Sequence, residues 1–274
     1  MLESKEPLSE RKSKLSAAIK KANKDSRLGL ILYIIPGFPS LQGYCEMKEI
    51  LDHKIFVTIL ETTFPVWDGF ATANETIIGA HRIAWQEVQG TRMKTLLTTK
   101  KPNFAVLYRR TIESLGITGI RDHYKGIIDA ATLEWDDPDP MNYAAPLQQA
   151  GIEYVPPVYP SMTLSQIKEA VGQTQQDGLF YLSCSPMTGG AMDDLSSIQK
   201  CAGLVKKLKP LSTIAAGMGL KGTADIKRLA VVEEIDAVVI GTSFLQALQK
   251  GLSDAQKFIA EIEPALYRSF IPIP

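Results

Sequence analysis

Residues 56–80 read FVTILETTFPVWDGFATANETIIGA, and this stretch contains the pattern from which the fold can be worked out. It opens with an apolar, β-branched run at residues 56–60, which is short enough to be a buried strand. The carboxylate Glu61 closes the run, a loop with proline and glycine follows, and a helical pattern begins at about Asn74. Barrel enzymes hold catalytic groups at the C-terminal ends of buried parallel strands. The alternative is that Glu61 only caps the next element or pairs with a cation.

Seven other apolar runs alternate with helical patterns along the chain. The expected strands cover residues 28–35, 56–60, 103–108, 130–135, 153–158, 178–184, 213–216 and 237–240. A further amphipathic helix over residues 8–24 precedes the first strand. Eight strands alternating with helices predict an α/β protein with a single (β/α)8 (TIM) barrel over residues 1–274 and an extra N-terminal helix. A doubly wound sheet is the alternative.

Composition indicates an ordinary globular chain of 274 residues, with 45% hydrophobic and 22% charged residues. Basic and acidic side chains balance at 30 each, so no overall charge favours nucleic acid or an anionic membrane. We therefore expect a small-molecule partner. No linker rich in proline, glycine or serine divides the chain into two domains.

The N-terminal residues, the cysteines and the histidines indicate where the protein acts and whether it holds a metal. The N-terminal residues are charged and lack the apolar core of a signal peptide, and the longest apolar run is too short to span a bilayer, which predicts a cytoplasmic protein. Three cysteines without CxxC spacing and three scattered histidines indicate neither a disulfide framework nor a metal site. We expect no cofactor.

Glycine follows each of the last three expected strands, at Gly189, Gly219 and Gly241. Glycine lets backbone N–H groups approach a ligand closely, and a short helix starting at Thr242 would direct its unpaired N–H groups at an anion. In barrels, phosphate sites form from these last loops and the N-terminus of a short helix. The pattern predicts a phosphate site, although glycine at any one position is also typical of a tight turn.

Several short segments at the expected strand ends together resemble one known family. They are residues 36–40 (PGFPS), 61–68 (ETTFPVWD), Tyr108, 136–138 (DDP), 187–189 (MTG), 217–219 (GMG) and 241–243 (GTS). Their order and spacing are similar to the tryptophan synthase alpha-subunit family. Members of that family are barrel lyases that cleave indole-3-glycerol phosphate to indole and glyceraldehyde 3-phosphate.

The resemblance implies roles for single residues. Glu61 matches the family's general acid/base, and Thr72 stands where an aspartate holds the indole N–H and stabilises the charge that develops on the ring. A neutral hydroxyl cannot supply that countercharge, and electrostatic effects of this kind are worth about 10²–10³ in rate. Asp68 or Glu75 would have to reach in as a substitute. We place Glu61, Thr72 and Tyr108 among the catalytic residues and expect these residues around the pocket: Tyr33, Asp68, Leu133 and Trp135.

Two more positions differ from the family. Matching the fourth strand to the family places Leu133 and Trp135 inward. Because side chains alternate along a strand, Thr132 and Glu134 are then expected to share the outward face. Trp135 would then fill the space that indole needs. An arginine of the family appears here as Cys184, for which a passive thiol or a nucleophile are the two interpretations.

These observations favour a diverged relative that binds a phosphorylated small molecule, uses Glu61 as acid/base and acts on something other than unmodified indole-3-glycerol phosphate. Three alternatives remain: the genuine lyase reaction, a specialised enzyme acting on a phosphate or a prenyl diphosphate, and a catalytically silent barrel that binds a partner. The resemblance also implies a partner subunit, and a homo-oligomer is possible. The loop after the second strand contains an apolar cluster that would either dock a partner or fold over the ligand: Phe64, Val66, Trp67 and Phe70.

Overall fold

The structure is a computed structural model that describes residues 12–134 and 141–268. The first half contains α1 (Lys14–Lys24), β1 (Gly29–Tyr33), α2 (Leu41–His53), β2 (Val57–Thr63), α3 (Glu75–Glu87), α4 (Met93–Leu97), β3 (Asn103–Tyr108), α5 (Arg109–Tyr124) and β4 (Ala130–Glu134). The second half contains α6 (Met141–Gln149), β5 (Glu153–Tyr154), β6 (Pro157–Val158), α7 (Leu164–Gly172), β7 (Leu179–Ser183), α8 (Leu195–Leu208), β8 (Thr213–Gly217), α9 (Thr223–Ala230), β9 (Ala237–Ile240), α10 (Thr242–Lys250), α11 (Leu252–Ile262) and a 3-10 helix (Glu263–Leu266).

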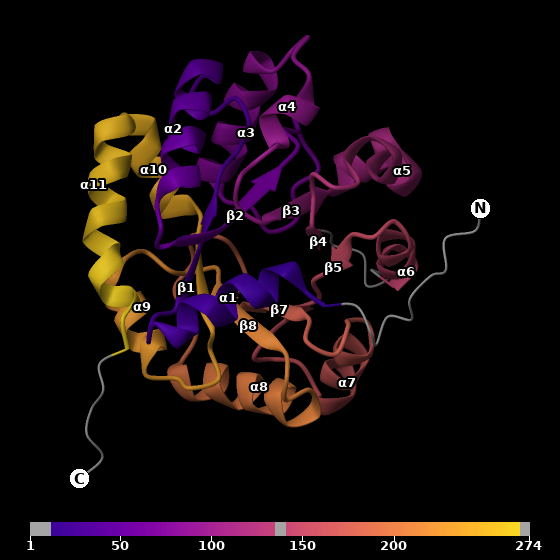
Figure 1. Ribbon diagram of the computed structural model, residues 1–274, viewed down its shortest axis with the longest axis vertical. Coiled ribbons are helices and arrows are strands. Elements are labelled where there is room, and N and C mark those ends of the chain that lie inside the picture. Colours follow the sequence, from indigo (N-terminus) through magenta and orange to yellow (C-terminus); the bar gives the residue numbers. More distant parts are fainter. Residues whose placement is uncertain (1–11, 135–140, 269–274) are drawn as a thin grey trace.

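The strands form a closed parallel barrel. Their order is β5-β4-β3-β2-β1-β9-β8-β7-β6, and the two end strands belong to one segment, residues 153–158. The sheet therefore closes on itself through the expected fifth strand, which is split because Pro156 and Pro157 have no N–H to give to a ladder. Helices surround the strands in Figure 1. The (β/α)8 barrel predicted from the sequence is confirmed.

Helix α1 closes the N-terminal end of the barrel. Its Leu15 and Ile19 are fully buried among inward-facing strand residues such as Ile31 and Ile59. Figure 1 shows the helix crossing in front of the strands. The predicted N-terminal helix is thus present, although the described helix starts at Lys14 rather than near residue 8. Because α1 closes the N-terminal end of the barrel, a pocket can open only at the C-terminal ends of the strands.

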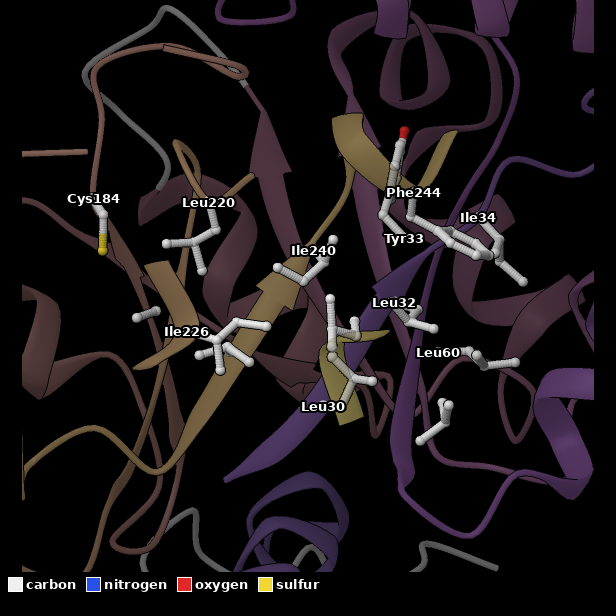
Figure 2. Packing of buried hydrophobic residues seen from close by; sticks show 14 of the residues in the cluster. Leu30, Leu32, Tyr33, Ile34, Leu60, Cys184, Leu220, Ile226, Ile240 and Phe244 are labelled. Atoms are coloured by element: carbon white, nitrogen blue, oxygen red, sulfur yellow. The ribbon is translucent and has the colours of Figure 1, made fainter. Parts of the chain in front are cut away.

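Alternation along the strands separates an inner core from an outer one. On β1, Ile31 faces the barrel interior, whereas Leu30 and Leu32 belong to the cluster between the strands and the helices. Figure 2 shows this outer cluster, with Leu60 of β2 beside them. Tyr33 comes next after Leu32, and its hydroxyl points away from the aliphatic side chains in the same view. The strand pleat thereby directs polar groups at the strand ends inward.

Some helices were not expected from the sequence. Helix α5 is polar on average and gave no clear apolar pattern, and α11 follows α10 directly after Gly251. Helix α5 packs on β3 and α6, whereas α11 packs on α10, α9 and the 3-10 helix. Among the described helices, none combines the length and apolar character needed to cross a membrane.

Candidate active site

A pocket opens at the C-terminal ends of the strands, at the end of the barrel opposite α1. Four strands in succession supply inward-facing polar side chains to its wall: Tyr33 of β1, Glu61 of β2, Tyr108 of β3 and Glu134 of β4. The loops after β7, β8 and β9 form the other side of the pocket, with Gly189, Gly219, Gly241 and Thr242.

Glu61 lies inside β2 rather than at its end, and its side chain faces this pocket. The residue is only 4% exposed. No side chain or backbone group in the described part of the chain forms a hydrogen bond or an ion pair with its carboxyl. Burial disfavours the charged form and raises the pKa of Glu61 to about 8. The pocket therefore contains a carboxyl group that is poised to exchange a proton near neutral pH.

Three buried side chains beside Glu61 form a hydrogen-bonded chain. The Tyr33 hydroxyl lies 2.8 Å from His81 Nε2 and 3.2 Å from the Tyr108 hydroxyl. Phe70 packs edge-on against both His81 and Tyr108, with ring centroids 5.1 and 5.3 Å away. The loop after β2 thus folds over these side chains.

The apolar cluster on that loop does not form an exposed docking patch. Phe64 and Val66 are buried, and Phe70 packs on Tyr108 and His81. Trp67 is 47% exposed and stacks with the Arg82 guanidinium, which lies 5.5 Å from its ring centroid. None of the four residues lines the pocket itself, although Phe70 packs on a lining residue, Tyr108.

Thr72 lies at the pocket, but its hydroxyl is engaged by a carboxylate that the sequence did not single out. Glu134 accepts hydrogen bonds from the Thr72 hydroxyl (2.9 Å), the Thr72 N–H (2.6 Å) and the Ala71 N–H (3.0 Å). On its other side, the Thr72 carbonyl accepts a hydrogen bond from the Thr188 N–H at 3.0 Å. The loop after β2 is therefore held between β4 and the loop after β7.

The expected orientation of the fourth strand is wrong. Ala130 packs in the barrel interior, so strand alternation turns Thr132 and Glu134 inward as well. Leu133 borders the pocket, but its side chain belongs to the outer cluster with Leu107 and Leu147. The expected inward and outward faces of the fourth strand are exchanged, as a shift of one residue along the strand would produce. Three residues from the sequence argument lie outside the described residues: Trp135, Asp136 and Asp137.

Two acids proposed as substitutes for the missing aspartate point elsewhere. Asp68 was expected at the pocket, but its side chain is 55% exposed and pairs with Arg110 at 2.6 Å. Glu75 is exposed in the first turn of α3, where an acid favours the helix N-terminus. Glu134 is the acid that the barrel brings to Thr72 instead.

The glycine turns leave backbone donors without partners. No described group accepts a hydrogen bond from the backbone N–H of Gly189, Gly219 or Gly241. The first turn of α10, from Thr242, adds further N–H groups without intrahelical partners. Gly189 and Gly219 have φ of +68° and +85°, a region that favours glycine. Together these groups could hold an anion across the pocket from Glu61.

Cys184 is not suited to act as a nucleophile. It is fully buried beneath the pocket wall, and burial raises the pKa of its thiol to about 12. Its Sγ lies 3.7 Å from the Leu182 carbonyl oxygen. At neutral pH the group is a protonated thiol. Among the described residues, no cluster of three or more His, Cys, Asp and Glu could hold a metal ion.

Comparison with known proteins places the chain in one family. A family model for the tryptophan synthase alpha chain matches residues 19–268. The chain belongs to the tryptophan synthase alpha chain family. The alpha chain of Paraburkholderia phytofirmans is 29% identical over 58% of this chain and 60% of its own length. That of Burkholderia thailandensis is 27% identical over 88% of this chain and 92% of its own.

Not every such relative aligns along its whole length, since the chain spans 60–63% of several of these tryptophan synthase alpha chains. Solved structures agree in fold. The structure of Mycobacterium tuberculosis tryptophan synthase superposes with a TM-score of 0.79 at 18% identity, over 94% of this chain and 100% of that one. The alpha subunit from Campylobacter jejuni gives 0.71 at 24% identity, over 86% and 96%.

Within this tryptophan synthase alpha barrel, several pocket residues were not expected from the sequence, among them Glu134, Tyr159 and Tyr181. His81, which lies behind the pocket wall, was not expected either. Glu134 could have been found by starting the strand alternation at Ala130, the first small apolar residue of β4. His81 gave no comparable signal. It lies on α3 and meets Tyr33 of β1 only because the closed barrel brings α3 and β1 together.

Proposed function

We propose that this chain is an acid–base lyase that acts on a phosphorylated small molecule, with Glu61 moving the proton. The observation that supports this most is the buried Glu61 carboxyl, which faces the pocket with no described hydrogen-bond partner. A pKa of about 8 allows the same group to hold and to release a proton near neutral pH. In the family that this chain belongs to, the matching glutamate has that role.

The anionic end of the substrate would lie at the glycine turns. Gly189, Gly219 and Gly241 line the same pocket as Glu61, and no described group accepts a hydrogen bond from their N–H groups. Thr242 adds a hydroxyl and the positive end of the α10 dipole. A phosphate held there would place the rest of the substrate toward Glu61.

We propose further that the substrate is not unmodified indole-3-glycerol phosphate. The wall around Tyr108 presents the Glu134 carboxylate and the hydroxyls of Tyr33 and Thr72. Glu134 already accepts three hydrogen bonds from residues 71–72, so an indole N–H would have to compete with the loop for it. An indole N–H would therefore find no uncommitted carboxylate among the described residues beside Thr72, which disfavours unmodified indole-3-glycerol phosphate.

The genuine indole-3-glycerol phosphate lyase is the second candidate, and one contact favours it. The family aspartate that Thr72 replaces is a carboxylate, and Glu134 brings a carboxylate to within 2.9 Å of the Thr72 hydroxyl. Glu134 would then supply from β4 the countercharge that the loop after β2 lacks.

Incubating the protein with indole-3-glycerol phosphate separates these two candidates. The assay follows indole release, with and without a tryptophan synthase beta subunit, because the family resemblance implies such a partner. We expect no indole in either case; indole release that disappears in Glu61→Gln would establish the second candidate. A Glu61→Gln variant that keeps the full biological activity of the wild type would reject both in favour of a silent, partner-binding barrel. Calorimetry with inorganic phosphate tests the anion site that both candidates share.

A further inference from the structure

The chain of His81, Tyr33 and Tyr108 is completely buried apart from its pocket end. His81 is 0% exposed, and the two tyrosines are 4% exposed each. The contacts run in one line, from His81 Nε2 to the Tyr33 hydroxyl and on to the Tyr108 hydroxyl. Tyr108 then borders the pocket beside Glu61. The direction in which hydrogens point along this line decides what Tyr108 offers to a ligand.

A backbone group fixes that direction at the far end. The Val66 N–H, which can only donate, is directed at His81 Nδ1 at 3.2 Å. Nδ1 must therefore be the unprotonated ring nitrogen. Burial lowers the pKa of His81 to about 3, so the ring is neutral and its single proton is on Nε2. Nε2 then donates to the Tyr33 oxygen.

The remaining hydrogens follow in order. Because the Tyr33 oxygen accepts from His81, the Tyr33 hydrogen is available for the Tyr108 oxygen at 3.2 Å. The Tyr108 oxygen accepts in turn, which turns its own hydrogen away from Tyr33 and toward the pocket. No other described group forms a hydrogen bond with the Tyr108 hydroxyl.

We propose that His81 is a positioning residue that orients this chain, and that Tyr108 is thereby held as a hydrogen-bond donor to a substrate oxygen beside Glu61. Only the nature of the ligand rests on the proposed function: it would be a phosphorylated compound with a hydroxyl or carbonyl oxygen. The direction of the hydrogen bonds does not depend on it. A donor fixed in this way stabilises negative charge that develops on that oxygen while Glu61 exchanges its proton. The orientation comes from a backbone amide, so it needs no rearrangement when the ligand arrives.

The orientation can be tested without any ligand. Long-range ¹H–¹⁵N NMR of the protein labelled on histidine distinguishes the two neutral tautomers and the charged ring. We expect His81 as the Nε2–H tautomer at neutral pH. An Nδ1–H tautomer or a charged imidazolium would overturn the inference, whatever the protein binds.

The donor itself can be tested by binding, with sn-glycerol 3-phosphate and inorganic phosphate as calorimetric probes. Tyr108→Phe and His81→Leu should each weaken glycerol 3-phosphate binding about 3- to 10-fold, the usual worth of one hydrogen bond, and leave phosphate binding unchanged. The double variant should lose no more than Tyr108→Phe alone, because both changes remove the same donor. His81→Gln, whose amide can accept from Val66 and donate to Tyr33, should restore most of the binding.

A matched control comes from Tyr181, a tyrosine that lines the pocket but does not take part in the hydrogen bonds between His81, Tyr33 and Tyr108. Its change to Phe should combine multiplicatively with His81→Leu. Multiplicative losses for His81→Leu with Tyr108→Phe would overturn the inference, and so would unchanged glycerol 3-phosphate binding in both single variants while phosphate still binds. If the wild type bound neither probe, the proposed function and the substrate part of this inference would both fail, and the tautomer would still decide the orientation.

Discussion

Replacing Glu61 by Gln should make the protein more stable at alkaline pH. The wild-type carboxyl is buried without a described partner, and its charged form is therefore disfavoured in the folded state. Glutamine has nearly the same shape and carries no charge at any pH. The variant keeps the packing of β2 while removing the cost of burying the charge.

The sign and size follow from the pKa of Glu61 in the two states. Below its ordinary value of 4.5 the group is protonated in both the unfolded and the folded chain, so pH has no effect through it. Between 4.5 and about 8 the unfolded chain loses the proton and the folded one keeps it, so wild-type stability falls as pH rises. Each pH unit changes the free energy of unfolding by about 1.36 kcal/mol. As pH rises through this range, the free energy of unfolding of Glu61→Gln should therefore increase by about 5 kcal/mol relative to that of the wild type.

Urea unfolding of both proteins at several values between about pH 5 and pH 9 measures this difference. The effect of pH through other groups is the same in both proteins and cancels in the difference. One such group is Glu153 at the far end of the barrel, whose pKa burial raises to about 7. The difference should grow steadily with pH and level off above about pH 8. A difference that stays flat, or that shrinks as pH rises, would show that burial does not raise the pKa of Glu61 in the folded protein.

Two further predictions concern the walls of the pocket. Glu134→Ala removes the acceptor for the N–H groups of Ala71 and Thr72, so hydrogen exchange at these two amides should accelerate about tenfold, and unchanged exchange would contradict the loop contact. Gly219→Ala should destabilise the protein by about 1–2 kcal/mol, because φ is +85° and the added Cβ would lie 3.1 Å from a backbone nitrogen. Gly79→Ala within α3, where a Cβ meets nothing within 4 Å, should instead stabilise it by about 0.5–1 kcal/mol in thermal unfolding.

The sequence predicts the barrel because a closed parallel sheet needs strands that are apolar on both faces. The runs at Asn103–Tyr108 and Ala237–Ile240 coincide with β3 and β9. Helix α5 could not be predicted in the same way, because it is polar on average and is interrupted at Gly116. Helix α11 has an amphipathic pattern, with Ala255, Ile259 and Ile262 buried, and was therefore predictable from the sequence.

The pocket was predictable where a residue's role depends on its own strand, and not where it depends on a neighbouring element. Glu61 and Tyr108 lie on strands whose pattern is clear, and the structure places both in the pocket. Asp68 pairs with Arg110 on α5, a helix that the sequence did not show. The contact between Glu134 and Thr72 depends on which face of β4 turns inward. A shift of one residue in that strand exchanges its two faces.

A crystal structure of the protein with sn-glycerol 3-phosphate would show whether one ligand reaches both the glycine turns and Glu61. The account predicts a phosphate within about 3 Å of the backbone N–H groups of Gly219, Gly241 and Thr242, with the glycerol extending toward the Glu61 carboxyl. A phosphate bound outside the pocket, or a glycerol directed away from Glu61, would contradict the account.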